Sequence, residues 1–301
     1  MTQSVLVTGA NGFFGRLLVP ALREHATVFA GVRAGGDADA GTRILGDLSE
    51  LPDLTAALDG IDCIVHCAAR AHVLREETDD PLPLFRAANR DATLHLARQA
   101  AAAGVKRMIF LSSIGVNGNQ TDGTPFRADD PPAPHAPYAI SKLEAEIGLT
   151  QIAAETGLEV VVIRPPLIIG PAPVGNLRTL SRLIATGLPI PFGAATRNRR
   201  SLVLASTLAD LIRVCLSHPN APGEPLLVAD TPPLSTRRIL EHLARETGQQ
   251  LRLLPVPVGL LRMSLRALGR GTIDQQLFGD LEIDISQTTA RLGWTPPTRQ
   301  S

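Results

Sequence analysis

Short apolar runs rich in β-branched residues recur along the first half of the chain and alternate with segments of helical periodicity. Residues 4–8 and 27–32 are such runs, and the apolar positions 17, 18, 21 and 22 between them share one helical face. Further strands are predicted at residues 43–45, 63–67, 107–111 and 159–163, with helices at 84–103 and 141–156. Strands that alternate with helices in this way predict an α/β fold, a doubly wound parallel sheet of the Rossmann type.

The pattern changes after residue 164, where six prolines interrupt the alternation before residue 192 and the later helical stretches become shorter. We therefore predict that residues 1–165 and 201–231 form a dinucleotide-binding domain. Residues 166–200 and 232–301 are predicted to form a smaller substrate-binding lobe over the C-terminal edge of the sheet. The polar, proline-rich loop at residues 119–137 is long for a compact domain, which favours a functional role.

Composition excludes several classes of function. The chain of 301 residues has 29 Lys+Arg and 29 Asp+Glu. It therefore lacks the basic excess that a nucleic-acid-binding protein needs to neutralise phosphates. No apolar run reaches the roughly 18–20 residues of a membrane span, and the N-terminus does not resemble a signal peptide. The three cysteines are odd in number and lack zinc-ligand spacing. These features predict a cytoplasmic protein with reduced thiols and no metal site.

Three glycines, Gly9, Gly12 and Gly15, connect the first predicted strand to the first predicted helix. Glycine allows a tight turn and a close approach of the backbone to a pyrophosphate, and the helix N-terminus supplies N–H groups and a positive dipole end. We therefore predict a dinucleotide site here, the alternative being a glycine-rich turn without a ligand. The other residues of the turn assigned to the cofactor are Asn11, Phe13 and Phe14.

The end of the second strand is expected to decide which cofactor is bound. NAD-specific sites carry an acidic residue there for the ribose hydroxyls, but this chain has Gly31-Val32-Arg33. Arg33 can pair with a 2′-phosphate, which favours NADP(H), whereas a solvated Arg33 leaves NAD(H) open. Asp47 follows the third strand and can accept a hydrogen bond from an adenine amino group.

The single tyrosine and one of the two lysines, Tyr138 and Lys142, are four residues apart and share a helical face. A lysine ammonium beside the phenol is expected to lower the tyrosine pKa, so that Tyr138 acts as a general acid or base; a surface ion-pair helix is the alternative. Ser113 at a strand end can hold the substrate oxygen and is preferred to Ser112. Asn89 either bridges to Lys142 through water or is a satisfied core residue.

These motifs together resemble the extended short-chain dehydrogenases/reductases of the NAD-dependent epimerase/dehydratase group, over almost the whole chain. The matching positions are Gly9, Gly12, Gly15, Asp47, His66-Cys67-Ala68-Ala69, Asn89, Ser113 and Tyr138-x-x-x-Lys142. The resemblance implies further cofactor contacts from Leu48, Cys67, Ala68, Ala69, Tyr138, Lys142 and Pro165. It also implies a nucleotide-sugar site formed by Ser113, Asn176, Leu177, Phe192 and Arg200. In that site Asn176 and Arg200 would touch the diphosphate, and Phe192 would pack on uracil.

Two segments differ from parts of this family. Members that eliminate water carry an Asp-Glu pair where this chain has Ile114-Gly115, so 4,6-dehydration is not expected. UDP-galactose epimerases usually hold an arginine before a Gly-Asp pair, where residues 275–278 are Gln-Gln-Leu-Phe. Residues 112–118, with Asn117 in place of the frequent tyrosine, look like the branch that reduces 4-keto-6-deoxy-N-acetylhexosamine nucleotides.

The leading expectation is therefore NAD(P)-dependent reduction of a UDP-4-keto-6-deoxy-N-acetylhexosamine. A UDP-hexose 4-epimerase is the alternative, and a regulator that senses NADP(H) without turnover is the alternative from another class. A nucleotide sugar is the expected partner, and a homodimer is a possible assembly.

An apolar helical stripe at Leu260, Leu261, Leu265 and Leu268 lies opposite arginines 262, 266 and 270. A helix with its stripe toward the core and its basic side in solvent is expected. Contact with an anionic membrane surface is the alternative.

Overall fold

The computed structural model describes residues 2–34, 41–71, 80–171 and 175–297, apart from the side chains of residues 176, 231 and 272. Its main sheet has seven parallel strands in the order β3-β2-β1-β4-β5-β6-β9. The strands are β1 (Ser4–Thr8), β2 (Thr27–Val32), β3 (Thr42–Ile44), β4 (Cys63–His66), β5 (Arg107–Leu111), β6 (Glu159–Arg164) and β9 (Leu226–Leu227). The chain order reverses direction at β1, which confirms the predicted doubly wound α/β fold.

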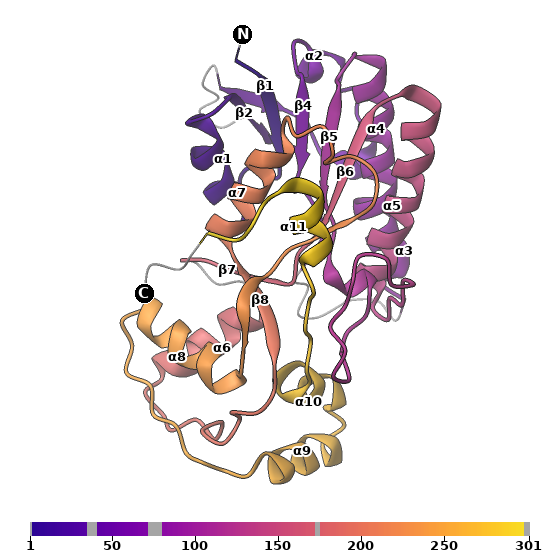
Figure 1. The fold of residues 1–301 in the computed structure, drawn as a ribbon. Coiled ribbons are helices and arrows are strands. Elements are labelled where there is room, and N and C mark those ends of the chain that lie inside the picture. The colour runs from indigo at the N-terminus through magenta and orange to yellow at the C-terminus, as the bar shows by residue number, and fades with distance from the viewer. Residues whose placement is uncertain (1, 35–40, 72–79, 172–174, 298–301) are drawn as a thin grey trace.

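Helices cover both faces of this sheet because its strands are apolar on both sides. In β1, for example, Val5 and Val7 face one hydrophobic core and Leu6 faces the other. The first core is closed by α1 (Gly15–Arg23), α7 (Ala205–Cys215) and α11 (Ser286–Leu292). The second is closed by α2 (Thr55–Leu58), α4 (Ala92–Ala102) and α5 (Pro137–Thr156). Figure 1 shows these two groups on opposite sides of the sheet.

The helix predicted at residues 84–103 is interrupted. It consists of α3 (Leu82–Phe85), a π-helical segment η2 (Arg86–Asp91) and α4. π-helical turns, which are wider than α-helical turns, are rare and often lie at functional sites. α5 begins at Pro137, four residues earlier than the predicted residue 141, because proline fits the first helical position.

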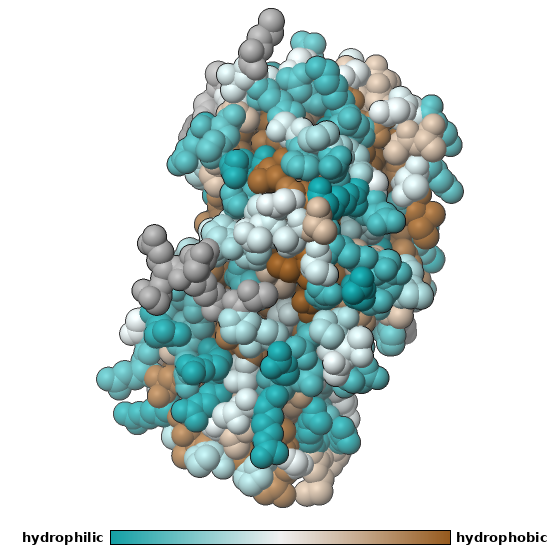
Figure 2. Space-filling view, viewed as in Figure 1, coloured by the Kyte–Doolittle hydropathy of each residue, from teal (hydrophilic) through white to brown (hydrophobic). Residues whose placement is uncertain are grey.

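The smaller lobe is built on a second sheet in the order β10-β8-β7. Its strands are β7 (Leu167–Ile169), β8 (Arg200–Leu204) and β10 (Asp230–Leu234). Its helices are α6 (Gly175–Ala185), α8 (Thr236–Glu246), α9 (Val258–Ala267) and α10 (Gly271–Phe278). Only two residues separate the C-terminal end of β6 from β7, so the lobe lies beyond that edge of the main sheet (Figure 1). Figure 2 shows this face of the molecule as mostly hydrophilic, with hydrophobic groups at its lower tip.

Two elements cross the predicted division of the chain. β8 lies at the start of the segment 201–231 but pairs with β7 and β10, whereas α7 and β9 from that segment join the main sheet. From the other predicted unit, α11 and Trp294 pack in the first core of the main sheet. We therefore propose a two-part division in which β8 belongs to the substrate-binding lobe and residues 286–294 belong to the dinucleotide-binding domain.

Candidate active site

The glycine turn after β1 is too tight for side chains. Gly9 has a φ of +67°, and a Cβ on it would lie 2.7 Å from the backbone nitrogen of Ala68. A Cβ on Gly15 would overlap the Gly9 carbonyl oxygen, to which Gly12 N donates a hydrogen bond of 2.8 Å. α1 begins at Gly15, so its positive dipole end lies at this turn. The turn therefore fits a pyrophosphate group.

A cleft of about 600 Å³ lies beside the turn, at the C-terminal ends of β1, β2 and β4. Nine predicted cofactor residues line it: Gly9, Asn11, Gly12, Arg33, Asp47, Leu48, Cys67, Ala68 and Ala69. Sequence reasoning missed other lining residues, including Ser49, Arg70, Leu84, Ala87 and Ala88. Of these, Ser49 could have been found, because Asp-x-Ser is a typical capping pattern. The cleft and the glycine turn together fit an extended dinucleotide.

Six predicted cofactor residues do not line this cleft: Tyr138 and Lys142, which are described below, and four others. Phe14 is buried in the first core and Phe13 packs against that core. Pro165 is buried, and its carbonyl accepts a hydrogen bond of 2.9 Å from Ile114 N. The fourth is Gly15. Contacts of these four residues with a cofactor would therefore have to come from the backbone or the ring edge of Phe13.

Arg33 and Asp47 form a charged pair at the rim of the cleft. Arg33 Nε lies 3.5 Å from Asp47 Oδ2, and the Arg33 side chain is 78% exposed. Asp47 Oδ1 accepts hydrogen bonds from Ser49 N at 3.0 Å and Ser49 Oγ at 2.6 Å. These bonds, assisted by Arg33, lower the pKa of Asp47, so the carboxylate is ionised at neutral pH. One Asp47 oxygen thus caps the N-terminus of the short helical turn at Leu48–Glu50, and the other faces Arg33.

Tyr138 and Lys142 lie in the first turns of α5. Lys142 is 1% exposed, and its Nζ donates a hydrogen bond of 2.8 Å to the carbonyl of Leu111, the last residue of β5. The same Nζ lies 5.9 Å from the centre of the Tyr138 ring. The Tyr138 ring is half-buried and meets Phe85 edge to face at 6.3 Å. Lys142 is therefore fixed between the strand end and the phenol.

The predicted lowering of the Tyr138 pKa is wrong for this structure. Burial raises the pKa of Tyr138 to about 12 and lowers the pKa of Lys142 to about 8. The physical reason is that Lys142 Nζ is directed at the Leu111 carbonyl and not at the phenol, so desolvation of the phenolate dominates. At neutral pH Tyr138 consequently carries its proton, which suits a proton donor.

The structure distinguishes the two strand-end serines. Ser112 is 3% exposed and its hydroxyl donates to Glu146 Oε1, so it is a structural residue. Ser113 is half-buried, and its Oγ accepts a hydrogen bond of 3.1 Å from Gly115 N. A Cβ on Gly115 would lie 3.3 Å from both Ser113 Oγ and the Ala139 Cβ. The Ser113 hydroxyl therefore lies beside the turn of α5 that carries Tyr138.

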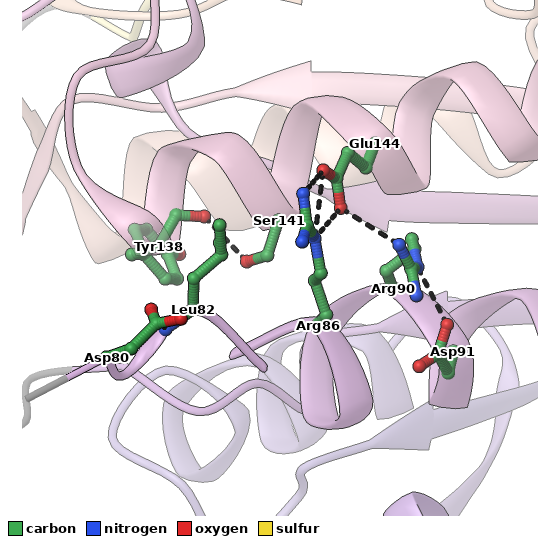
Figure 3. Close-up of polar contacts among 8 residues, drawn as sticks. All are labelled: Asp80, Leu82, Arg86, Arg90, Asp91, Tyr138, Ser141 and Glu144. Atoms are coloured by element: carbon green, nitrogen blue, oxygen red, sulfur yellow. Dashed lines mark hydrogen bonds and ion pairs between the residues drawn. The ribbon is translucent and has the colours of Figure 1, made fainter. Parts of the chain in front are cut away.

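Asn89 is fully buried in η2, and its amide is satisfied by protein groups. Its Oδ1 accepts from Arg70 N at 2.8 Å, and its Nδ2 donates to Arg70 O and to Ser141 Oγ, both at 3.1 Å. Ser141 Oγ in turn donates to the Tyr138 carbonyl at 2.8 Å (Figure 3). This geometry matches the core-residue alternative, and Asn89 positions the start of α5.

A second link between η2 and α5 was not predicted. Arg86 Nη2 lies 2.6 Å from Glu144 Oε1, and Arg90 Nη1 lies 3.2 Å from Glu144 Oε2. Figure 3 shows both arginines reaching the same carboxylate, while Arg90 also contacts Asp91. The hydrogen bonds from Arg86 lower the pKa of Glu144. The π-helical segment is thereby fastened to the helix that carries Tyr138.

A buried histidine connects the glycine-turn side of the site to Asn89. Thr93 Oγ1 donates its proton to the Asn89 carbonyl at 2.7 Å, so it can only accept from His66 Nε2 at 3.0 Å. His66 Nδ1 then accepts from Thr8 Oγ1 at 2.7 Å, and Thr8 Oγ1 accepts from Ala68 N. His66 is therefore the neutral Nε2–H tautomer, and burial lowers its pKa to about 3.

A buried ion pair lies behind the strand-end serines. Glu146, four residues after Lys142 on α5, is bound by Arg164 Nη2 at 2.6 Å, and both residues are at most 5% exposed. Arg164 Nη1 also donates to Asn117 Oδ1 at 3.0 Å. Asn117, which the sequence placed in the substrate-related segment, is thus part of the packing behind the site.

The predicted substrate residues of the lobe are engaged within the protein. Leu177 is 1% exposed in the core of the lobe, so only its backbone could reach a ligand. Phe192 meets Phe278 edge to face at 5.6 Å. Arg200 Nη1 donates to the Gly279 carbonyl at 3.0 Å, and burial lowers the pKa of Arg200. The side chain of Asn176 lies outside the described residues.

Among the described residues, no helix is long and apolar enough to cross a membrane, and no cluster of His, Cys, Asp and Glu has the composition of a metal site.

Comparison with known proteins gives consistent matches. The profile of the NAD dependent epimerase/dehydratase family matches residues 5–229. The chain is 40% identical over 301 residues to a UDP-glucose 4-epimerase of Vibrio cholerae, covering 99% of this chain and 92% of that protein. It is 30% identical to the N-acetyl-α-D-glucosaminyl-diphospho-ditrans,octacis-undecaprenol 4-epimerase of Escherichia coli O157:H7, covering 87% and 78% of the two chains. Its fold is similar to that of MoeE5 in complex with UDP-glucuronic acid and NAD, with a TM-score of 0.76, 26% identity, and coverage of 98% and 94%.

Proposed function

The chain belongs to the NAD dependent epimerase/dehydratase family, and from this membership we propose that it is an oxidoreductase acting at C4 of a UDP-sugar. Membership makes it an NAD-dependent enzyme, as predicted from the sequence. The regulator that only senses a cofactor is therefore not retained. The preference for NADP(H) that Arg33 suggested remains a prediction.

One observation carries the proposal. Lys142 is held at the end of β5 beside Tyr138, and Ser113 lies against the same turn of α5. The charge of Lys142 also acts on Cys67, a residue that lines the dinucleotide cleft. This supports a site in which Lys142 lies near the dinucleotide cleft, with Tyr138 and Ser113 beside it.

We infer a role for each of these residues from this geometry. When bound, the nicotinamide supplies hydride exchange with a sugar carbon. Tyr138, protonated at neutral pH, donates its hydroxyl proton to the sugar oxygen on reduction and accepts it back on oxidation. The Ser113 Oγ already accepts a hydrogen bond from Gly115 N. Its hydroxyl donates a hydrogen bond to the sugar oxygen that receives the Tyr138 proton. To stabilise the phenolate that remains after proton transfer, the Lys142 ammonium, 5.9 Å from the ring centre, would have to turn from the Leu111 carbonyl toward the phenol.

Two reactions use this arrangement, and a different observation favours each. Epimerisation at C4 is favoured by the 40% identity to a UDP-glucose 4-epimerase along the whole chain. Reduction of a 4-keto sugar is favoured by residues 112–118, which resemble the 4-keto-6-deoxy-N-acetylhexosamine branch. The absence of an acidic pair at Ile114-Gly115 gives no support to 4,6-dehydration.

The test is incubation of the purified protein with two substrate sets. UDP-glucose, UDP-galactose and their N-acetyl forms are supplied with catalytic NAD, and UDP-4-keto-6-deoxy-N-acetylhexosamine is supplied with NADPH or NADH. An epimerase interconverts the first set with no net change in cofactor. A reductase consumes one reduced cofactor for each molecule of the keto sugar. If neither set reacts, and the Tyr138→Phe variant behaves like the unmodified protein, the proposed function is wrong.

A further inference from the structure

The helix α9 presents part of its hydrophobic residues to solvent. Leu260 and Met263 are 52% and 63% exposed, and Ala267, one turn further on, is also exposed. These positions are three and four residues apart, so they form one face of the helix. Leu268, directly after the helix, is 69% exposed. The expectation that the stripe of Leu260, Leu261, Leu265 and Leu268 faces the core is therefore wrong for Leu260 and Leu268.

This outward orientation is fixed by contacts on the opposite side of the helix. Leu261 and Leu265 are half-buried, and Arg262 Nη2 donates a hydrogen bond of 2.7 Å to the Phe278 carbonyl of α10. Arg262 and Arg266 both pair with Asp274, which is 5% exposed, at 3.1 Å and 3.0 Å. The apolar face therefore cannot turn inward without breaking these contacts.

The exposed large hydrophobic residues are concentrated in one stretch of the chain. Ten large hydrophobic side chains are exposed in the described part of the chain, and five of them lie between residues 254 and 273. We call these the tip patch: Leu254, Leu260, Met263, Leu268 and Ile273. Figure 1 places α9 at the end of the lobe farthest from the main sheet, and Figure 2 shows hydrophobic groups at that end. Nothing within the described chain covers this surface.

The charge around the tip patch is positive, although the net charge of the chain is zero. Residues 251–273 contain four arginines and no aspartate or glutamate. Asp274 neutralises one charge of the Arg262 and Arg266 pair, while Arg252 and Arg270 are exposed. An apolar face bordered by arginines is complementary to the boundary between acyl chains and anionic head groups.

We propose that the tip patch docks this enzyme on an anionic membrane surface, with α9 lying in the head-group region. The helix lies at the interface and does not span the bilayer, since it has only ten residues. The proposal concerns the surface of the lobe and does not depend on which sugar the site converts.

The test is flotation of the full-length protein with vesicles of equal parts phosphatidylcholine and phosphatidylglycerol, compared with vesicles of phosphatidylcholine alone. Binding is expected on the anionic vesicles and should weaken with added salt. Leu260→Glu should reduce the vesicle-bound fraction at least about tenfold, because the apolar area of this side chain no longer leaves water on binding. Arg252→Gln and Arg270→Gln should each weaken binding by about fivefold.

Ile147→Glu is the matched control, because Ile147 is 53% exposed on α5, far from α9. It should float like the unmodified protein. Equal loss of binding in the control and in the Leu260 variant, or no binding of the unmodified protein to either vesicle, would overturn the proposal. The proposal would also be overturned if the unmodified protein is a dimer by light scattering and binds no vesicles, while the Leu260→Glu variant is a monomer. The tip patch would then be covered by a second copy of the chain.

Discussion

At the scale of single residues, the neighbours of each titratable group in the site fix its protonation state. Tyr138 is kept protonated and His66 neutral by burial, and Asp47 is kept ionised by Ser49. The partners of His66, Thr8 and Thr93, are distant in sequence, whereas Ser49 lies two residues from Asp47. A local sequence pattern could therefore reveal the state of Asp47 but not that of His66.

The neutral state of His66 predicts a stability that depends on pH. Its native pKa of about 3 lies below the ordinary value of 6.5, so between these pH values the unfolded chain binds a proton that the native protein does not. The free energy of unfolding should therefore fall as the pH decreases through this window, by about 1.4 kcal/mol per pH unit from this group.

Urea denaturation between pH 7 and pH 4 measures this slope. His66→Gln should flatten it, whereas His25→Gln, at an exposed histidine, should leave it unchanged. An equal slope in the unmodified protein and the His66 variant would show that His66 is not buried in the neutral form.

Arg33 predicts the choice of cofactor. If its exposed guanidinium binds a 2′-phosphate, Arg33→Asp should weaken NADPH binding at least about tenfold and change NADH binding little. Fluorescence titration of both cofactors measures this, with Arg23→Asp at the far end of α1 as the control. Equal losses for the two cofactors, or none, would remove Arg33 from this role.

At the scale of elements, α5 carries the proposed chemistry on one side and its structural contacts on others. Glu144 binds Arg86 and Arg90 near the surface, while Glu146 binds Arg164 inside the protein. The two carboxylates differ mainly in burial, with side-chain exposures of 24% and 7%. They therefore form a natural comparison of a surface ion pair with a buried one.

Glu146→Gln should lower the free energy of unfolding by about 3–5 kcal/mol, because it leaves the buried guanidinium of Arg164 without its counter-charge. Glu144→Gln should cost only about 0.5–1 kcal/mol. Thermal or urea unfolding of the two variants measures the difference. If both substitutions cost the same, the ion pair of Glu146 and Arg164 is not buried as described.

Elements with a strong local signal were predictable, and those decided by tertiary contacts were not. The strands of the main sheet follow from apolar runs such as Val5–Val7, and the glycine turn follows from the spacing of Gly9, Gly12 and Gly15. The π-helical turn η2 has no such signal, because it depends on the bonds of Asn89 and Arg86 to α5. The outward face of α9 was mispredicted because Asp274, in the next helix, decides where the arginines point.

At the scale of the whole molecule, the C-terminal segment joins the two sheets. Thr121 N donates to the Asp280 carbonyl at 2.9 Å, and Phe126 N donates to the Glu282 carbonyl at 2.8 Å, so the long loop 119–137 is fastened to residues 280–284. Ser201 N, from β8 of the lobe, donates to the Leu281 carbonyl at 2.7 Å. The predicted functional loop is therefore linked to the substrate lobe through residues 280–284.

The central claim is that Tyr138 exchanges a proton with the sugar oxygen, and one variant tests it most directly. Tyr138→Phe keeps the ring beside Phe85 but removes the hydroxyl. We expect cofactor affinity, measured by fluorescence titration, to stay nearly unchanged, because the glycine turn and Lys142 remain. Single-turnover hydride transfer with the substrate identified in the panel should slow by roughly 10²–10⁴-fold. Hydride transfer at the rate of the unmodified enzyme would contradict the account, since the acid would then have to be another group.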